Sequence, residues 1–217
     1  MRILVINPNS SRAFTEIIER SVAPLRASGA YHIDCVGLSG TPAGIETQRD
    51  IDNVVEPLCK FVAAESDRTD AFVVACFGDP GLFSAREVTA KPVVGICESG
   101  LSTALSLGER YGVISTSSAN RNAELKLVRS YGLYERCAGF EPVDMPVVDI
   151  PTSPWSRDRV LAAGERLKVH GADVLVLGCA GMAPHKSALQ EELRLPVVEP
   201  TISATAMAIG IAVQKAA

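Results

Sequence analysis

The sequence predicts an α/β protein with two similar lobes, each containing a four-stranded parallel sheet flanked by helices. Short apolar runs that end in turn residues alternate with longer stretches of helical pattern, which is typical of parallel sheets. The pattern also occurs twice: Val5-Ile6-Asn7 matches Val113-Ile114-Ser115, Cys76 matches Cys179, and Pro92-Val93-Val94 matches Pro196-Val197-Val198. A pseudo-two-fold axis relating two such lobes would place the active site in the cleft between them.

The first half of the chain supplies most of the first lobe. Apolar runs bounded by Gly, Pro, Asn or Asp predict strands at 2–6, 32–38, 72–76 and 92–96. Helices are expected at 12–28, 50–66 and 83–89, the first of them capped by Ser10 or Ser11 and closed by Gly29.

The second half repeats this order. Strands are expected at 111–115, 139–144, 174–179 and 196–199, and helices at 102–108, 121–131, 158–170 and 202–215. We therefore assign residues 1–98 plus 203–217 to lobe 1 and residues 99–202 to lobe 2.

Composition limits the possible functions. The chain has 217 residues, of which 47% are hydrophobic and 21% charged, with a formal net charge of −4, so nothing favours binding to nucleic acid or to an anionic membrane. The first apolar run leads straight into a turn and is too short for a signal peptide. We expect a cytoplasmic protein with reduced thiols and no metal, because the six cysteines form no CxxC pair and the three histidines are scattered.

Two of the six cysteines stand at equivalent places in the repeat. Cys76 and Cys179 each end an apolar run and each precede a turn that contains glycine. Ligands of parallel sheets bind outside the carboxyl ends of the strands, where both thiols are expected. The other four cysteines (Cys35, Cys59, Cys97 and Cys137) are interpreted as small core residues, although Cys97 also ends a predicted strand.

Two opposed thiols can invert a stereocentre without a cofactor. A thiolate on one face of a carbon takes its proton, while a thiol on the other face supplies one. Backbone N–H groups of the two turns could lower a thiol pKa and stabilise the carbanion. Glycine in each turn lets the backbone approach a ligand closely.

Three motifs carry a family resemblance. Asn7-Pro8-Asn9-Ser10, Cys76-Phe77-Gly78-Asp79-Pro80-Gly81 and Gly178-Cys179-Ala180-Gly181-Met182 resemble the hydantoin and allantoin racemases of the aspartate/glutamate racemase superfamily, along essentially the whole chain. The resemblance implies cofactor-free racemisation with Cys76 and Cys179 as the two acid/bases, and a homo-oligomer. It also places Asn7, Thr116 and Ser117 at polar strand ends beside the cysteines.

The residues that follow the cysteines favour a neutral substrate. Amino-acid racemases of this superfamily have Asn-Thr and Thr-His after their cysteines, whereas this chain has Phe77-Gly78 and Ala180-Gly181. This suits the ring of a 5-substituted hydantoin. The substrate contacts expected are Asn7, Phe77, Gly78, Asp79, Thr116, Ser117, Ala180, Gly181 and Glu199.

Several alternatives stay open. Allantoin racemase, maleate isomerase and amino-acid racemase are other reactions of the superfamily, while arylmalonate decarboxylases keep only the second cysteine. A two-lobed binding protein that only closes on a small ligand has no need of paired thiols. The 37–44 segment resembles a phosphate loop but lacks its Gly-Lys-Ser/Thr ending, so we interpret it as a loop near the cleft; His185 could assist or cap, and Asp79 organises its own turn.

Overall fold

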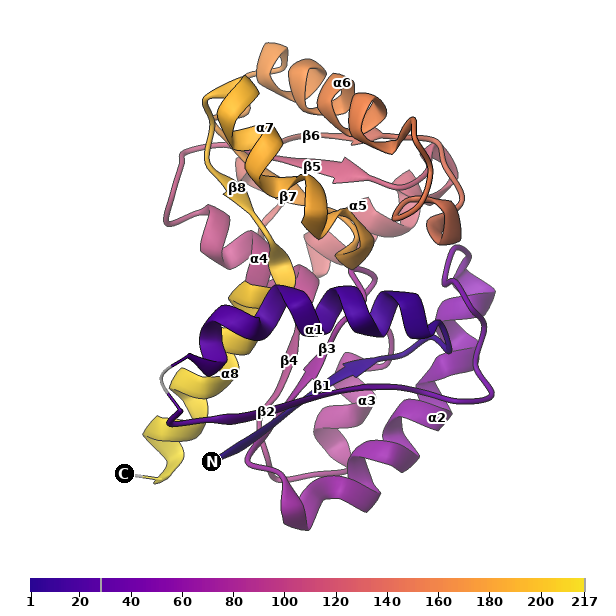
Figure 1. Cartoon of the computed structure of the whole chain (residues 1–217), viewed down its shortest axis with the longest axis vertical. Helices are drawn as coiled ribbons and strands as arrows, with labels where there is room; N and C mark the ends of the chain where they lie inside the picture. Colours follow the sequence, from indigo (N-terminus) through magenta and orange to yellow (C-terminus); the bar gives the residue numbers. More distant parts are fainter. Residues whose placement is uncertain (28, 217) are drawn as a thin grey trace. The chain divides into compact units, whose positions relative to one another are not determined.

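The structure is a computed structural model that describes residues 1–27 and 29–216. The chain divides into two compact units, Met1–Ser99 with the segment that begins at Thr201, and Gly100–Pro200 (Figure 1). Each unit contains one four-stranded parallel sheet flanked by helices, which confirms the predicted fold class.

The sheet of the first unit has the strand order β2-β1-β3-β4. Its strands are β1 (Arg2–Asn7), β2 (His32–Gly37), β3 (Ala71–Val74) and β4 (Val93–Gly95). Its helices are α1 (Arg12–Arg26), α2 (Gln48–Glu65), α3 (Leu82–Glu87) and α8 (Pro200–Ala216), and α4 (Ile96–Ala104) leads into the second unit.

The sheet of the second unit has the equivalent order β6-β5-β7-β8. Its strands are β5 (Tyr111–Ser115), β6 (Cys137–Pro142), β7 (Val174–Leu177) and β8 (Val197–Val198). The helices are α5 (Arg121–Ser130), α6 (Ser156–Val169), α7 (Lys186–Leu193) and the 3₁₀ segment η5 (Ala180–His185).

Right-handed crossovers set the face on which each helix lies. The chain moves outward from β1 to β2 and then back to β3, so α1 covers one face of the first sheet and α2 and α3 the other. In the second unit α5 lies on one face and α6 and α7 on the opposite one (Figure 1). Because both faces are covered, β3, β5 and β7 are buried along their whole length.

Helix caps explain where α1 and α2 begin. The Ser11 hydroxyl accepts a hydrogen bond from the Phe14 N–H, which confirms the predicted cap; the expected helix end at Ser28 lies outside the described residues. Thr47 and Asp50 form a capping box, so α2 starts two residues earlier than the expected position 50.

One predicted helix has the wrong bounds, and one helix was not predicted. The helix expected at 102–108 is α4, which begins at Ile96 directly after β4, so Cys97 lies in a helix rather than at the end of a strand. The first N–H groups of α4 are capped by the side chain of Asp79, which lies outside the helix and its flanking residues, so no local sequence pattern predicts this start. The helix α7 was not predicted, because Lys186–Leu193 is short and follows a loop rich in Gly and Pro.

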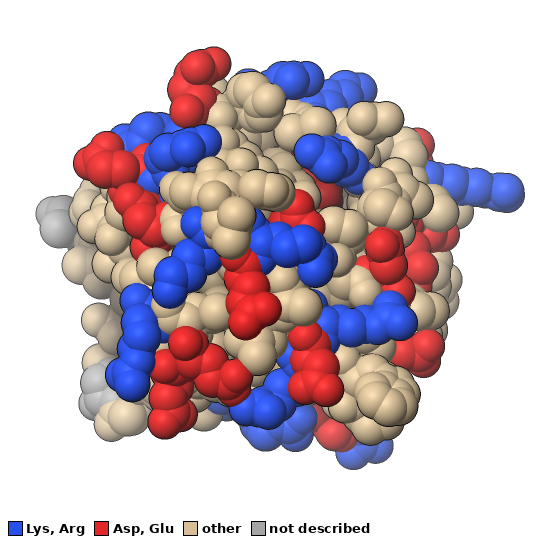
Figure 2. Space-filling view, turned by 90° about the horizontal axis from the view of Figure 1, so that it is seen from above, with Lys and Arg blue, Asp and Glu red and all other residues tan. Residues whose placement is uncertain are grey.

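The surface and the helices bear on the environment of the protein. Lys and Arg side chains alternate with Asp and Glu side chains on the face drawn in Figure 2. Among helices of the described residues, none combines the length and the apolar character that crossing a bilayer requires.

Candidate active site

Cys76 lies just beyond the carboxyl end of β3. The Ala75 N–H donates to the Ile6 carbonyl at 2.8 Å, which extends the β1–β3 ladder to the residue before the thiol. The Cys76 carbonyl then accepts the Asp79 N–H at 2.9 Å and closes a four-residue turn. Phe77 is buried and Cys76 is partly exposed, so the turn presents the thiol at the sheet edge where ligands of parallel sheets bind.

Asp79 fixes this turn to the start of α4. Its carboxylate accepts the N–H groups of Cys97 at 3.0 Å and Glu98 at 2.9 Å, while the residue is only 5% exposed. The backbone of Asp79 has φ 41°, in the left-handed region. A Cβ atom on Gly95 would lie 2.4 Å from the Asp79 carboxyl carbon, so only glycine leaves room for it. The carboxylate therefore anchors the Cys76 turn, and a substrate contact of Asp79 stays a prediction.

Asn7 ends β1 beside this turn and is 1% exposed. Its amide nitrogen donates to Asn9 Oδ1 at 2.9 Å and to the Thr15 hydroxyl at 3.1 Å. The Asn7 side chain thus organises the 7–11 loop and ties it to α1. The next loop is joined to it, because the Ser10 N–H donates to the Pro42 carbonyl at 3.0 Å. This places the 37–44 segment beside the β1 exit, and a substrate contact of Asn7 stays a prediction.

Cys179 repeats the backbone frame of Cys76. The Gly178 N–H donates to the Ile114 carbonyl at 2.8 Å, and the Cys179 carbonyl accepts the Met182 N–H at 3.0 Å. A Cβ on Gly178 would lie 2.4 Å from that Ile114 oxygen, which explains the glycine before the thiol. Cys179 is 9% exposed and leads into η5, with Ala180 and Gly181 buried behind it.

The polar residues after β5 lie at the same edge as Cys179. The register of β5 and β7 pairs Ile114 with Leu177, so Thr116 follows the strand level with Cys179. Asn120 donates to the Thr116 hydroxyl at 3.3 Å, and the Ser117 hydroxyl accepts the Ala119 N–H at 3.2 Å. The exit of β5 is therefore built like that of β1, from side chains that hydrogen-bond to their own loop.

The expected site residues gather in two groups. Cys76, Phe77, Gly78, Asp79 and Asn7 lie at the carboxyl edge of the first sheet, and Cys179, Ala180, Gly181, Thr116, Ser117 and Glu199 at that of the second. Glu199 follows β8 and is 2% exposed. The contacts that these residues make with a substrate stay predictions.

Three of the remaining cysteines have thiols disfavoured as thiolates. Burial raises the pKa of Cys35 to about 11, and burial also raises the pKa of Cys59 and of Cys137. Cys97 is 1% exposed within the core. These environments suit packing rather than proton transfer at neutral pH.

His185 ends η5 and links it to α6. Its Nε2 lies 2.9 Å from the Ser156 hydroxyl. Burial, with a smaller contribution from the Arg157 charge, lowers the pKa of His185 and so favours a neutral ring. The contact with Ser156 gives His185 a structural role, and its assistance in proton transfer stays a prediction. No group of three or more His, Cys, Asp and Glu side chains in the described part of the chain is placed to hold a metal ion.

Sequence reasoning missed one polar pair. The Ser115 hydroxyl at the end of β5 donates to the Glu124 carboxylate at 2.6 Å. The only sequence signal was that Ser115 matches Asn7 in the repeat, because Glu124 stands among charged residues of an ordinary surface helix.

Comparisons with known proteins agree with this arrangement. The family model described as Asp/Glu/Hydantoin racemase matches residues 3–208. A hydantoin racemase from Pseudomonas sp. (strain NS671) is 38% identical over 209 residues, 94% of this chain and 82% of that protein. The solved structure of an allantoin racemase from Klebsiella pneumoniae has a TM-score of 0.93 at 31% identity, covering 99% of this chain and 89% of that one. A glutamate racemase from Bacillus anthracis, with a TM-score of 0.72 and 17% identity over 98% of this chain and 82% of that one, shows the shared fold alone.

The fold and these relatives define the class of protein, an isomerase built from two α/β units. The chain belongs to the Asp/Glu/Hydantoin racemase family.

Proposed function

We propose that the chain racemises 5-substituted hydantoins, with Cys76 and Cys179 exchanging protons with opposite faces of ring carbon C5. The observation that carries the proposal is that the same backbone arrangement occurs in each unit and holds one thiol there. In each unit the preceding residue closes the ladder to the neighbouring strand, and the cysteine carbonyl closes a four-residue turn. Two equivalent thiol positions are what proton transfer on two faces requires.

The chemistry needs only the thiols and the turns. The thiolate of one cysteine takes the C5 proton, and the electron pair left on C5 is delocalised onto the adjacent ring carbonyl. N–H groups of the two turns stabilise the developing oxyanion. The thiol of the other cysteine then donates its proton to the opposite face of C5, which regenerates a thiolate and inverts the centre. No redox change occurs, and we therefore expect turnover without a cofactor.

The choice of a neutral ring rests on the residues beside the thiols. Phe77 is buried, and Gly78, Ala180 and Gly181 offer backbone groups and no charge. A zwitterionic amino acid would leave its ammonium and carboxylate without partners there, which costs binding energy. Allantoin is the second candidate, because it carries the same ring and the solved allantoin racemase has a TM-score of 0.93 to this chain.

The direct test follows the optical rotation of enantiopure 5-benzylhydantoin and allantoin in the presence of a chelator, with glutamate, aspartate and maleate as comparison substrates. We expect loss of rotation for one or both ring compounds and none for the amino acids. Binding of a ring compound without loss of its rotation would support the binding-protein alternative. Activity that a chelator removes and a metal restores would contradict cofactor-free turnover.

Single-thiol variants test the two-face mechanism. Cys76→Ala and Cys179→Ala should each abolish racemisation, yet each keeps one thiol that can exchange a proton with solvent. In D₂O, after subtraction of the uncatalysed exchange, each variant should label C5 of one enantiomer, and the two variants should label opposite enantiomers. Cys35→Ala and Cys137→Ala are matched controls, one in each unit, and should racemise normally. Labelling of the same enantiomer by both thiol variants would refute opposed faces.

Two further expectations accompany this function. The family resemblance implies a homo-oligomer, which light scattering of the purified protein would test. A cytoplasmic location also stays a prediction, and cell fractionation would check it.

A further inference from the structure

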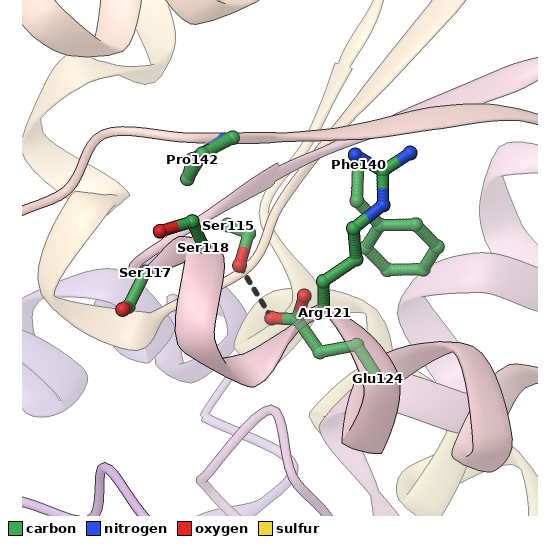
Figure 3. Close-up of a pocket in the computed structure, with 7 residues that line it drawn as sticks. All are labelled: Ser115, Ser117, Ser118, Arg121, Glu124, Phe140 and Pro142. Atoms are coloured by element: carbon green, nitrogen blue, oxygen red, sulfur yellow. Dashed lines mark hydrogen bonds between the residues drawn. The ribbon is translucent and has the colours of Figure 1, made fainter.

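A small cavity lies where β5 ends, on the side of α5 (Figure 3). Its volume is about 30 Å³, and its lining consists of Ser115, Ser117, Ser118, Arg121, Glu124, Phe140 and Pro142. Oε1 of the Glu124 carboxylate accepts the Ser115 hydroxyl at 2.6 Å. Oε2 of the same carboxylate is buried and has no hydrogen-bond partner among the described residues.

A buried oxygen without a partner is costly, and the cost is larger when the oxygen carries a charge. The burial of Oε2 therefore favours the protonated, neutral form of the Glu124 carboxyl group.

The surroundings also favour a neutral carboxyl group. Burial raises the pKa of Glu124 to about 7, against the opposing effects of the Ser115 hydrogen bond and the Arg121 charge. Arg121, on α5 itself, is the ionisable group in the lining besides Glu124, while β5 and β6 contribute Ser115, Phe140 and Pro142, none of them ionisable. A neutral carboxyl group still accepts the Ser115 hydroxyl at Oε1, and it places no charge on the buried Oε2.

The equivalent strand end in the first unit carries a different pair of side chains. In the first unit the equivalent Asn7 reaches Thr15 of α1, so the strand exit is tied to the next helix by neutral groups alone. In the second unit Ser115 reaches Glu124 of α5. Only the second of these two ties includes a group that can ionise.

The tie lies next to the second thiol. Thr116 follows Ser115 and is level with Cys179 across the β5–β7 register. The carbonyls of Ser115 and Thr116 accept the N–H groups of Val143 at 3.0 Å and Met145 at 3.2 Å, which closes the exit against the loop after β6.

We propose that Glu124 is a proton-dependent positioning residue: its neutral carboxyl group, held by Ser115, keeps the 115–117 exit closed beside Cys179, and ionisation, which would bury a charge on Oε2, loosens that exit. The effect on the exit is independent of substrate, whereas any effect on turnover rests on the proposed function.

The sign of the pH dependence follows from linkage. The Glu124 carboxyl group has a raised pKa in the closed state, so its contribution to the stability of the closed exit is fully present at any pH below its ordinary pKa. This contribution falls as pH rises toward about 7, and above that pH the stability stays constant. Between about pH 5 and 7, opening of the exit should therefore increase roughly tenfold per pH unit.

Hydrogen exchange of the Val143 and Met145 amides measures this opening directly. After correction for the intrinsic exchange rate, the wild-type chain should show that slope and a plateau above pH 7. Glu124→Gln, which keeps the neutral shape and the hydrogen bond from Ser115, should give a flat profile. Glu165→Gln, an exposed change on α6 of the same unit, should behave like the wild type. A flat wild-type profile, or a slope that persists in Glu124→Gln, overturns the proposal.

Kinetics separate a positioning role from simple packing. At pH 6 the KM of Glu124→Gln should stay within about twofold of the wild-type value, because the amide reproduces the neutral acid. Glu124→Ala should raise KM roughly tenfold, since the loss of one hydrogen bond of about 1.4 kcal/mol corresponds to that factor. Equal effects of Gln and Ala would overturn the positioning role. If no hydantoin is turned over at all, the proposed function fails, and the exchange experiment still decides the present inference.

Discussion

The Asp79 anchor gives a stability series that can be worked out from the structure. Asp79→Ala leaves the Cys97 and Glu98 N–H groups without their acceptor, and each hydrogen bond to a charged group contributes about 1.5 kcal/mol or more. Alanine at φ 41° adds about 1 kcal/mol of backbone strain. We expect a loss of about 4 kcal/mol for Ala, about 3 kcal/mol for Gly, which has no such strain, and about 1.5 kcal/mol for Asn, which keeps one acceptor.

Urea unfolding of the full chain measures these losses in the free energy of unfolding, followed by circular dichroism. A double-mutant cycle with Gly95→Ala adds an internal control, because its Cβ meets the Asp79 carboxylate and should cost less once that side chain is removed. A free energy of unfolding for Asp79→Ala within about 0.5 kcal/mol of the wild-type value, which is typical of surface changes, would show that the carboxylate does not anchor the turn. An Ala variant equal to the Gly variant would refute the strain component alone.

Three further predictions concern single positions. Gly178→Ala should destabilise the chain by about 3 kcal/mol, because the new Cβ meets the Ile114 carbonyl. Gly210→Ala on α8, where the Cβ meets open space, should stabilise the chain by about 0.5–1 kcal/mol. Thermal unfolding compares the two variants. Cys35 should react with iodoacetamide at pH 8 roughly 100-fold more slowly than an ordinary thiol of pKa 9.0, because its pKa is about 11; mass spectrometry of labelled peptides measures this, and rapid labelling contradicts its buried environment. Asp173 accepts the Arg110 and Glu109 N–H groups, and these hydrogen bonds lower its pKa. It should therefore contribute stability at neutral pH that is lost as pH falls below its ordinary pKa of 3.8. Urea titrations at different pH should show a smaller loss of stability in acid for Asp173→Asn than for the wild type, and an equal loss counts against this role.

Local sequence signals predicted the parts of the fold that local forces determine. The Ser11 cap is visible as a serine before an amphipathic run, and the strands are visible as short apolar runs. The start of α4 was not predictable in this way, since its N–H groups are capped by Asp79, far earlier in the chain. Residues that stabilise a helix across such a separation leave no periodic trace.

The site shows the same division. The two cysteines could be selected from six because the repeat places both at strand ends. The side chains that hold those strand ends could not, because Asn7 and Ser115 use different partners on their next helices, Thr15 and Glu124. Tertiary geometry determines these pairs, and the repeat alone does not specify it.

The division of the chain has a consequence for biosynthesis. The second unit is one continuous segment, Gly100–Pro200, and its two ends meet, since a Cβ on Gly100 would lie 2.8 Å from the Pro200 ring. The first unit, in contrast, includes α8, which is synthesised after the second unit. Domains usually fold in the order of their synthesis. Here the order reverses, because the second unit is complete before α8 of the first unit has been synthesised. A nascent chain stalled between the two should therefore contain a protease-resistant second unit before the first unit becomes resistant.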